Sequence, residues 1–136
     1  MKIIAVIPAH LASVRFPRKV LFPFYGLPMI EHVRRRALMS KAISKLFVAT
    51  SDKEIADVVE GYGGDVIMTG NYHSNGTSRV AEAISQIDCA HVILLQGDEP
   101  LLLPRHVDAM AEALQANPNG DAWNVTGPIE SPDELD

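Results

Sequence analysis

The sequence has 136 residues, which suits a single domain, and its hydrophobic fraction of 47% is enough to fill a core. The formal net charge of -5 provides no basic face of the kind that binds nucleic acid, so nucleic acid is not expected as a partner. A single cysteine, Cys89, excludes an internal disulfide and fits the cytoplasm, and no run approaches the ~18 apolar residues that would insert into a membrane.

Short apolar runs alternate with helical patterns along the chain. The apolar run 3–7 predicts a first strand that is covered on both faces, as in a parallel sheet. Further strands are predicted at 46–49, 66–68, 92–95 and 122–125, and helices at 28–39, 53–62, 77–87 and 104–114. This alternation predicts an α/β fold with a mostly parallel sheet and helices on both faces.

The last residues favour the start of another helix. Ser131 is a good N-cap residue, Pro132 suits the first helical position, and Glu134 stands where it can complete a capping box. We therefore expect residues 1–136 to be an N-terminal part of a longer protein, truncated within one domain.

Four loops follow the first four predicted strands and contain most of the unusual polar residues. Ligands of open parallel sheets bind beyond the carboxyl ends of the strands, so these loops are the candidate site. They cover residues 8–19, 50–52, 69–76 and 96–100.

The first of these loops concentrates positive charge at a strand end. Arg15, Arg18 and Lys19 supply cations and Ser13 a hydroxyl, which together suit a polyphosphate. The alternative is a solvated surface loop, although two bracketing prolines favour a held conformation. No Walker or Gly-x-Gly-x-x-Gly pattern is present, which argues against P-loop ATPases and dinucleotide enzymes.

The loop after the fourth strand contains two carboxylates. Asp98 directly follows Gly97, which permits close backbone approach, and a carboxylate at a strand end is a common ligand of Mg²⁺. Asp98 is preferred over Glu99 because its shorter side chain lies nearer the strand. The alternative is a polar turn before Pro100.

The third loop ends in a segment that opens a helix. Its hydroxyls, the free helix N–H groups and Arg79 could bind a base, a sugar or a phosphate. The alternative is an Asn75-Gly76 turn followed by a Thr77 cap.

Two further features are interpreted structurally. The five histidines, at positions 10, 32, 73, 91 and 106, lack the spacing of zinc ligands, and the basic run 34–36 is interpreted as a solvated helix face. No Gly-x-Ser-x-Gly motif supports a hydrolase nucleophile.

Taken together, these segments resemble the CMP-Kdo synthetases, the 3-deoxy-manno-octulosonate cytidylyltransferase family. The resemblance extends over essentially the whole chain and is closest to the subgroup acting on 8-amino-3,8-dideoxy-manno-octulosonate. Two segments, 8–19 and 26–33, are also similar to other sugar nucleotidyltransferases. The matching segments, in order, are 8–19, 26–33, 48–52, 73–79 and 96–100.

The resemblance implies a Rossmann-like nucleotidyltransferase fold and a CTP-dependent enzyme of lipopolysaccharide biosynthesis. Such an enzyme transfers CMP from CTP to a Kdo-type sugar acid and releases pyrophosphate, with Mg²⁺ as cofactor. Two alternatives remain open, namely a non-catalytic truncated nucleotide-binding fragment and a cytidylyltransferase for another sugar acid such as N-acylneuraminate.

The resemblance also implies roles for individual residues. Arg15, Lys19 and Asp98 would be the catalytic residues, with Arg15 and Lys19 binding the CTP phosphates and Asp98 holding Mg²⁺. The remaining residues would bind substrate, with Gln96 facing the sugar; they are His10, Ser13, Ser74, Thr77, Arg79 and Gln96.

The chain departs from the family at two positions and in length. His10 stands where the family has arginine, which removes a permanent charge and a bidentate phosphate donor. Arg18 stands where many members have glycine. Members also continue well past Asp136, into a part that carries dimer contacts, much of the sugar site and a second Mg²⁺ carboxylate, so the full-length protein is expected to be a homodimer.

Overall fold

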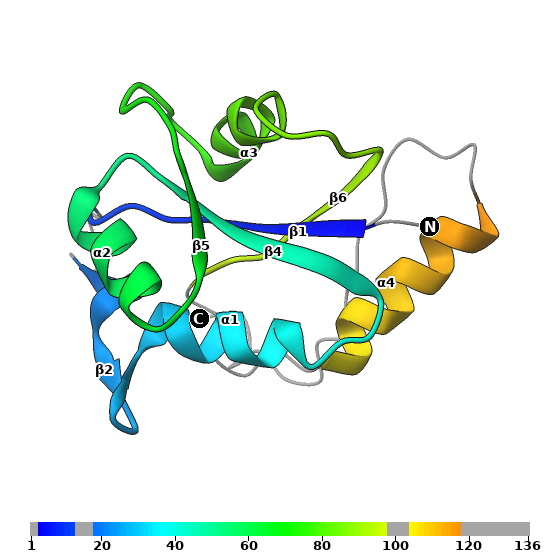
Figure 1. The fold of residues 1–136 in the computed structure, drawn as a ribbon, viewed down its shortest axis with the longest axis horizontal. Helices are drawn as coiled ribbons and strands as arrows, with labels where there is room; N and C mark the ends of the chain where they lie inside the picture. The colour runs from blue at the N-terminus through cyan, green and yellow to red at the C-terminus, as the bar shows by residue number, and fades with distance from the viewer. Residues whose placement is uncertain (1–2, 13–17, 98–103, 118–136) are drawn as a thin grey trace, which may run out of the picture.

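The computed structural model describes residues 3–12, 18–97 and 104–117 (Figure 1). Its main sheet contains β1 (Ile3–Pro8), β4 (Ile43–Thr50), β5 (Asp65–Met68) and β6 (His91–Leu94). The helices are α1 (Met29–Leu38), α2 (Lys53–Gly61), α3 (Gly76–Ile84) and α4 (Pro104–Ala116), and a 3-10 turn, η1 (Lys19–Leu21), precedes α1. The predicted strand at 122–125 and the predicted helix that begins at Ser131 lie outside the described residues.

The four strands are parallel and lie in the order β5-β4-β1-β6. β1 pairs with β4 on one side and with β6 on the other, with Val6 opposite both Phe47 and Leu94. The chain winds outward from β1 to β5 and then returns to the other side of β1 at β6. The order therefore changes direction between β1 and β6, where open α/β sheets bind their ligands.

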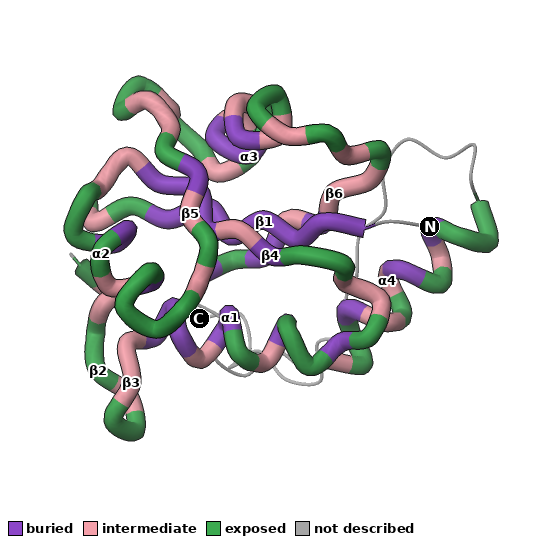
Figure 2. Tube along the Cα trace, in the orientation of Figure 1, coloured by how far each residue is buried: buried purple, intermediate pink, exposed green. Residues whose placement is uncertain are grey.

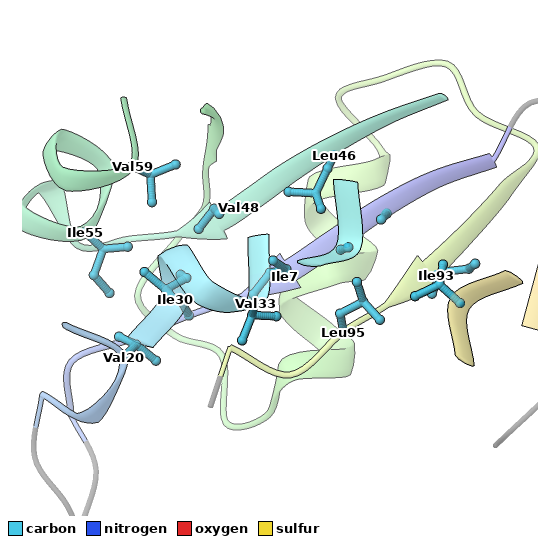
Figure 3. Packing of buried hydrophobic residues seen from close by; sticks show 14 of the residues in the cluster. Ile7, Val20, Ile30, Val33, Leu46, Val48, Ile55, Val59, Ile93 and Leu95 are labelled. Atoms are coloured by element: carbon cyan, nitrogen blue, oxygen red, sulfur yellow. The ribbon is translucent and has the colours of Figure 1, made fainter. Parts of the chain in front are cut away.

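Both faces of β1 are covered, as its apolar sequence predicts. Ile3, Ala5 and Ile7 belong to a buried cluster with residues of α1, α2 and α4 (Figure 3). Ile4 and Val6 belong to a second cluster with residues of α3 on the opposite face. Figure 1 shows α3 on one side of the sheet and α1 and α4 on the other, and Figure 2 shows β1 buried along its length. The predicted α/β architecture is confirmed.

The end of α2 follows from two glycines. Gly63 has a φ of 86°, a left-handed conformation that favours glycine, and its N–H donates to the Glu60 carbonyl at 2.9 Å. The Gly64 N–H donates to the Val59 carbonyl at 2.9 Å, which closes the last turn. The helix therefore ends where the sequence predicts.

A small hairpin between η1 and α1 was not predicted. It consists of β2 (Pro23–Phe24) and β3 (Leu27–Pro28), joined by Tyr25 and Gly26 with φ values of 49° and 79°. Positive φ at both turn positions is typical of a type I′ turn, which normally carries Asn-Gly or Asp-Gly. Tyrosine at the first position gives no such signal.

The interpretation of the basic run as a solvated face is wrong for Arg34. Its side chain is buried, and its Nε donates to both carboxylate oxygens of the fully buried Glu31, at 2.9 and 3.0 Å. Arg34 Nη2 also donates to the Tyr62 carbonyl at 3.2 Å, and Arg35 Nε donates to Glu31 at 3.1 Å. The run therefore ties α1 to the end of α2. Within the described ranges, no helix has the length and apolar character needed to span a membrane.

Candidate functional site

A cleft of about 480 Å³ opens at the carboxyl ends of the four parallel strands. All four loops that the sequence identifies contribute to it, because the residues following β1, β4, β5 and β6 meet at this edge. Its lining consists of Pro8, Ala9, His10, Ala12, Lys19, Val20, Ser51, Asp52, Asn71, His73, Ser74, Asn75, Gly76, Arg79, Gln96 and Gly97.

The structure brings together five of the predicted site residues. The predicted residues that line the cleft are His10, Lys19, Ser74, Arg79 and Gln96. Thr77 is exposed in the first turn of α3 and is not part of the lining. Ser13, Arg15 and Asp98 lie outside the described residues.

The described ends of the first loop are anchored by backbone and carboxylate contacts. The Ala9 N–H donates to the Ala49 carbonyl, and the Leu11 N–H donates to Asp52 Oδ2, both at 2.9 Å. The Arg18 N–H donates a hydrogen bond to the Leu11 carbonyl at 2.9 Å, and this bond joins the two ends of the loop. Asp52 lines the cleft, and the sequence assigned it no individual role. Its place before the first turn of α2, directly after a strand, is the signal that could have identified it.

Arg18 differs from its prediction, because its guanidinium pairs with Glu54 and it is not part of the lining. Nη1 donates to Glu54 Oε2 at 2.9 Å, and Nη2 donates to Oε1. The hydrogen bond from Arg18 holds the pKa of Glu54 below its ordinary value, and the same bond raises the pKa of Arg18. Arg18 therefore adds no unpaired charge to the cleft. Lys19, the next residue, lines the cleft instead.

The third loop leads into α3 through an asparagine cap. Asn75 Oδ1 accepts a hydrogen bond from the Ser78 N–H at 2.8 Å, so Asn75, not Thr77, is the N-cap residue. The alternative of an Asn75-Gly76 turn followed by a Thr77 cap is therefore wrong about the cap, which lies two positions earlier, with Gly76 as the first residue of α3. Asn75 and Ser74 both line the cleft, so the cap and the candidate site coincide.

Arg79 lies in the lining and also supports the third loop. It is 5% exposed, and its Nη1 donates to Thr69 Oγ1 at 2.7 Å and to the Gly70 carbonyl at 3.2 Å. Its guanidinium brings a permanent positive charge to the cleft while two loop oxygens fix its position.

Two glycines allow the loops to approach the end of β1. A Cβ atom on Gly97 would lie 3.2 Å from Ile7 Cγ2, and one on Gly76 would lie 3.0 Å from Pro8 Cγ. Both distances are tighter than ordinary contact, so larger residues would push these loops away from the strand. Gly97 thus has the close approach predicted for it.

The described part of the chain contains no group of three or more His, Cys, Asp or Glu side chains that could hold a metal ion. The cleft carboxylate that is described, Asp52, accepts the hydrogen bond from Leu11. A metal site in this cleft would therefore depend on the predicted ligand Asp98, which is bonded to the cleft residue Gly97.

Comparison with known proteins gives consistent matches over the chain. The 3-deoxy-manno-octulosonate cytidylyltransferase of Geobacter sulfurreducens is 44% identical over 118 residues, which cover 87% of this chain and 47% of the relative. The 8-amino-3,8-dideoxy-manno-octulosonate cytidylyltransferase of Shewanella amazonensis is 43% identical over 121 residues, covering 87% of this chain and 49% of the relative. The chain spans about half the length of the curated relatives it matches.

Solved structures share the same architecture. A CMP:2-keto-3-deoxy-manno-octonic acid synthetase complexed with CTP superposes with a TM-score of 0.85 at 39% identity, covering 88% of this chain and 49% of that one. A cytidylyltransferase from Leptospira borgpetersenii shares the fold, with a TM-score of 0.78 at 23% identity over 88% of this chain and 51% of its own.

The family model described as cytidylyltransferase matches residues 4–135, which include all four loops of the cleft and every described element except the first residue of β1. With that match, and with relatives above 40% identity over most of the chain, the chain belongs to the cytidylyltransferase family.

Proposed function

We propose that this chain is the nucleotide-binding part of an enzyme that transfers CMP from CTP to a Kdo-type 3-deoxy sugar acid and releases pyrophosphate. The observation that carries the proposal is the cleft at the switch point between β1 and β6, in a chain that is 39% identical to a synthetase solved with CTP. A cleft of about 480 Å³ is within the usual range of small-molecule sites.

The cleft residues divide into two groups in this proposal. Lys19, Arg79 and His10 border the space with basic groups that suit a triphosphate. Ser74 supplies a hydroxyl for the nucleotide, and Gln96 faces the sugar. Ser13, Arg15 and Thr77 keep their predicted roles as proposals, although the structure places Thr77 outside the lining.

The reaction joins the anomeric hydroxyl of the sugar to the α-phosphorus of CTP. The new bond forms between that oxygen and phosphorus, the bond to the β-phosphate oxygen breaks, the hydroxyl proton is released, and pyrophosphate leaves. The contribution of this chain is to orient the triphosphate and to neutralise its charge with fixed cations, which is how most phosphoryl-type transfers are accelerated.

Mg²⁺ fits the donors that this chain offers. One carboxylate, Asp98, follows the cleft residue Gly97, and Mg²⁺ takes one or two protein carboxylates together with phosphate oxygens and waters. When bound, Mg²⁺ supplies charge neutralisation at the phosphates. Asp98 is proposed as the ligand.

The identity of the sugar acid is proposed from the relatives. Those that act on Kdo and on its 8-amino derivative are 44% and 43% identical to this chain, so both sugars are candidates. Either sugar would place the full-length protein in lipopolysaccharide biosynthesis. We further propose that residues 1–136 form part of one domain, that the longer protein is a homodimer, and that it acts in the cytoplasm.

Pyrophosphate release tests this proposal. This chain and a longer version completed from a relative are incubated with CTP, Mg²⁺ and, in turn, Kdo, 8-amino-Kdo and N-acylneuraminate. Release from the longer protein with one of the first two sugars is expected. Release with N-acylneuraminate alone would show a different sugar acid, and CTP binding without turnover by either protein would show a non-catalytic module.

The metal assignment has a separate test on this chain alone. CTP binding is measured by calorimetry with and without Mg²⁺ for Asp98→Ala, with Asp57→Ala on the outer surface of α2 as the matched control. Asp98→Ala is expected to abolish the dependence on Mg²⁺, whereas Asp57→Ala leaves it intact. An unchanged dependence in Asp98→Ala contradicts the assignment.

A further inference from the structure

The loop between β5 and α3 borders the cleft, and its shape is set by α3. Both backbone polar groups of Gly70, its N–H and its carbonyl, are hydrogen-bonded to side chains of α3. Its N–H donates to both carboxylate oxygens of Glu82 at 3.1 Å, and its carbonyl accepts from Arg79 Nη1 at 3.2 Å. Arg79 and Glu82 lie one turn apart on α3, so one helix face fixes the start of the loop.

Glu82 collects further contacts from the same loop. The Tyr72 hydroxyl donates to Oε1, and His73 Nε2 lies 3.2 Å from the same oxygen. The second nitrogen of His73, Nδ1, lies 3.0 Å from Ser78 Oγ, and the His73 side chain is 5% exposed. Both imidazole nitrogens therefore have partners on α3, and His73 borders the cleft as a fixed wall rather than as a mobile base.

The Tyr72 ring covers Gly70 and His73 on the solvent side. A Cβ atom on Gly70 would lie only 2.1 Å from Tyr72 Cε1, so the ring occupies space that a larger residue at position 70 would fill. The ring also packs on His73, with centroids 4.4 Å apart. Tyr72 is nevertheless exposed, and its hydroxyl bond to Glu82 holds an otherwise solvated side chain in place.

The charge of Glu82 is consistent with this role. The hydrogen bond from Tyr72, followed by that from the Gly70 N–H, holds the pKa of Glu82 below its ordinary value, and the same contact raises the pKa of Tyr72. Glu82 is therefore an ionised acceptor at neutral pH, and hydrogen bonds to charged groups are stronger than neutral ones.

We propose that Glu82 is a positioning residue for the nucleotide: it does not line the cleft, but it holds Gly70, Tyr72 and His73 so that the loop presents Asn71 and Ser74 to the ligand. This inference rests on the proposed function, because the ligand it positions is CTP. It assigns to a residue outside the cleft the task of pre-organising one wall, which lowers the cost of ordering that wall upon binding.

The test compares three variants of this chain. Glu82→Gln keeps the size of the side chain but removes its charge, and Tyr72→Phe removes one hydroxyl. Asp57→Asn is the matched control, because Asp57 is an exposed carboxylate paired with Lys53 on α2. Calorimetry is expected to show CTP binding about tenfold weaker in Glu82→Gln, a smaller loss in Tyr72→Phe, and no change in Asp57→Asn.

The Gly70 amide provides a readout that does not need a ligand. Its hydrogen-exchange protection, followed by NMR, is expected to fall in Glu82→Gln and to persist in Asp57→Asn. If wild type binds no CTP, the proposed function fails, yet this measurement still tests the contact between Glu82 and the loop. Unchanged Gly70 protection in Glu82→Gln overturns the inference, as does unchanged CTP affinity where wild type binds.

A pH titration distinguishes positioning from simple packing. Because the folded pKa of Glu82 is lowered, its stabilising contacts are complete above the ordinary glutamate pKa of about 4.3 and are lost as the pH falls through the lower folded value. The Gly70 amide shift is expected to titrate with a midpoint below about 4.3 in wild type. The titration should be absent in Glu82→Gln, and a midpoint at or above the ordinary value would overturn the inference.

Discussion

His10 and Arg18 stand near opposite ends of the loop that follows β1. His10 is exposed and lines the cleft, whereas Arg18 pairs with Glu54 on α2. The φ of 61° at Arg18 lies in the left-handed region that favours glycine and costs other residues about 1 kcal/mol. The two departures from the family therefore differ in kind, because one changes the chemistry of the cleft and the other strains the backbone beside it.

Replacing Arg18 tests the strain. Arg18→Gly and Arg18→Ala both lose the exposed ion pair with Glu54, which solvent screens, but only glycine relieves the left-handed backbone. We expect Arg18→Gly to be more stable than Arg18→Ala by about 1 kcal/mol in urea denaturation. Equal stability, or a more stable alanine variant, would show that the backbone at this position is not strained.

Replacing His10 tests the chemistry of the cleft. Arginine at position 10 adds a permanent charge and a bidentate donor to the lining, so His10→Arg is expected to tighten CTP binding about tenfold in calorimetry. His106→Arg, at an exposed position on α4, adds the same charge away from the cleft and serves as control. Equal effects of the two substitutions would count against phosphate binding by the first loop.

Among the elements, α1 and α2 are joined through a buried charge cluster. Glu31 is fully buried and pairs with Arg34, whose guanidinium also reaches the Tyr62 carbonyl at the end of α2. Arg35 adds a second contact to Glu31 and lies over the Tyr62 ring, 5.4 Å from its centroid. Because a buried carboxylate needs its partners, the packing of these two helices depends on this cluster.

A single variant and a double variant test that dependence. Arg34→Leu leaves Glu31 buried with only the partly exposed Arg35 as its ion-pair partner, so a loss of about 3 kcal/mol is expected in guanidinium denaturation. Glu31→Leu with Arg34→Leu removes the unpaired charge and is expected to recover most of that loss. If the double variant is less stable than the single one, the cluster stabilises the helices beyond satisfying its own charges.

The elements themselves were largely predictable from periodicity. The run 3–7 alone indicated burial on both faces, and the apolar spacing at 53–62 predicted the helix in which Ile55 and Val59 are buried. Both signals depend only on neighbouring residues in the sequence, and the structure agrees with both. The strand-end rule likewise predicted a site where four distant loops meet, without any knowledge of their contacts.

Two of the failures share a physical cause, which is contact between residues far apart in the chain. The sequence does not indicate that Arg34 is buried, because its environment depends on Tyr62, the residue that follows another helix. Glu82 is similar, since its importance arises from Gly70, twelve positions earlier, and a glutamate on a helix face is ordinarily solvated.

At the scale of the whole molecule, β1 and β4 each contribute buried residues to both clusters. Ile7 belongs to the cluster with residues of α1 and α2 (Figure 3). Val6 belongs to the cluster with residues of α3, so both layers of helices pack on the same sheet. A shared sheet between the two layers of helices makes the described part of the protein one cooperative unit, in which damage to either cluster lowers the stability of both.

Ile30 tests this cooperativity. It is fully buried against the sheet, and Ile30→Ala is expected to lower the free energy of unfolding by about 3 kcal/mol through the cavity it creates. Leu38→Ala, on the same helix but 48% exposed, should change it by less than about 0.5 kcal/mol. Far-UV circular dichroism in urea measures both, and two separate transitions in Ile30→Ala would show that the layers unfold independently.

The proline that ends β1 determines where the sheet parts. The Val6 carbonyl accepts from the Leu95 N–H at 3.0 Å, which shows that even-numbered residues of β1 direct their peptide groups toward β6. The next bond of that ladder would run from the nitrogen of residue 8 to the Leu95 carbonyl, but an imino acid has no hydrogen to donate. On the other side, Ala9 still bonds to Ala49. Because Pro8 has no N–H, the hydrogen-bonded ladder ends on the β6 side of β1 while it continues on the β4 side. The position at which the cleft begins is therefore set by the covalent structure of a proline.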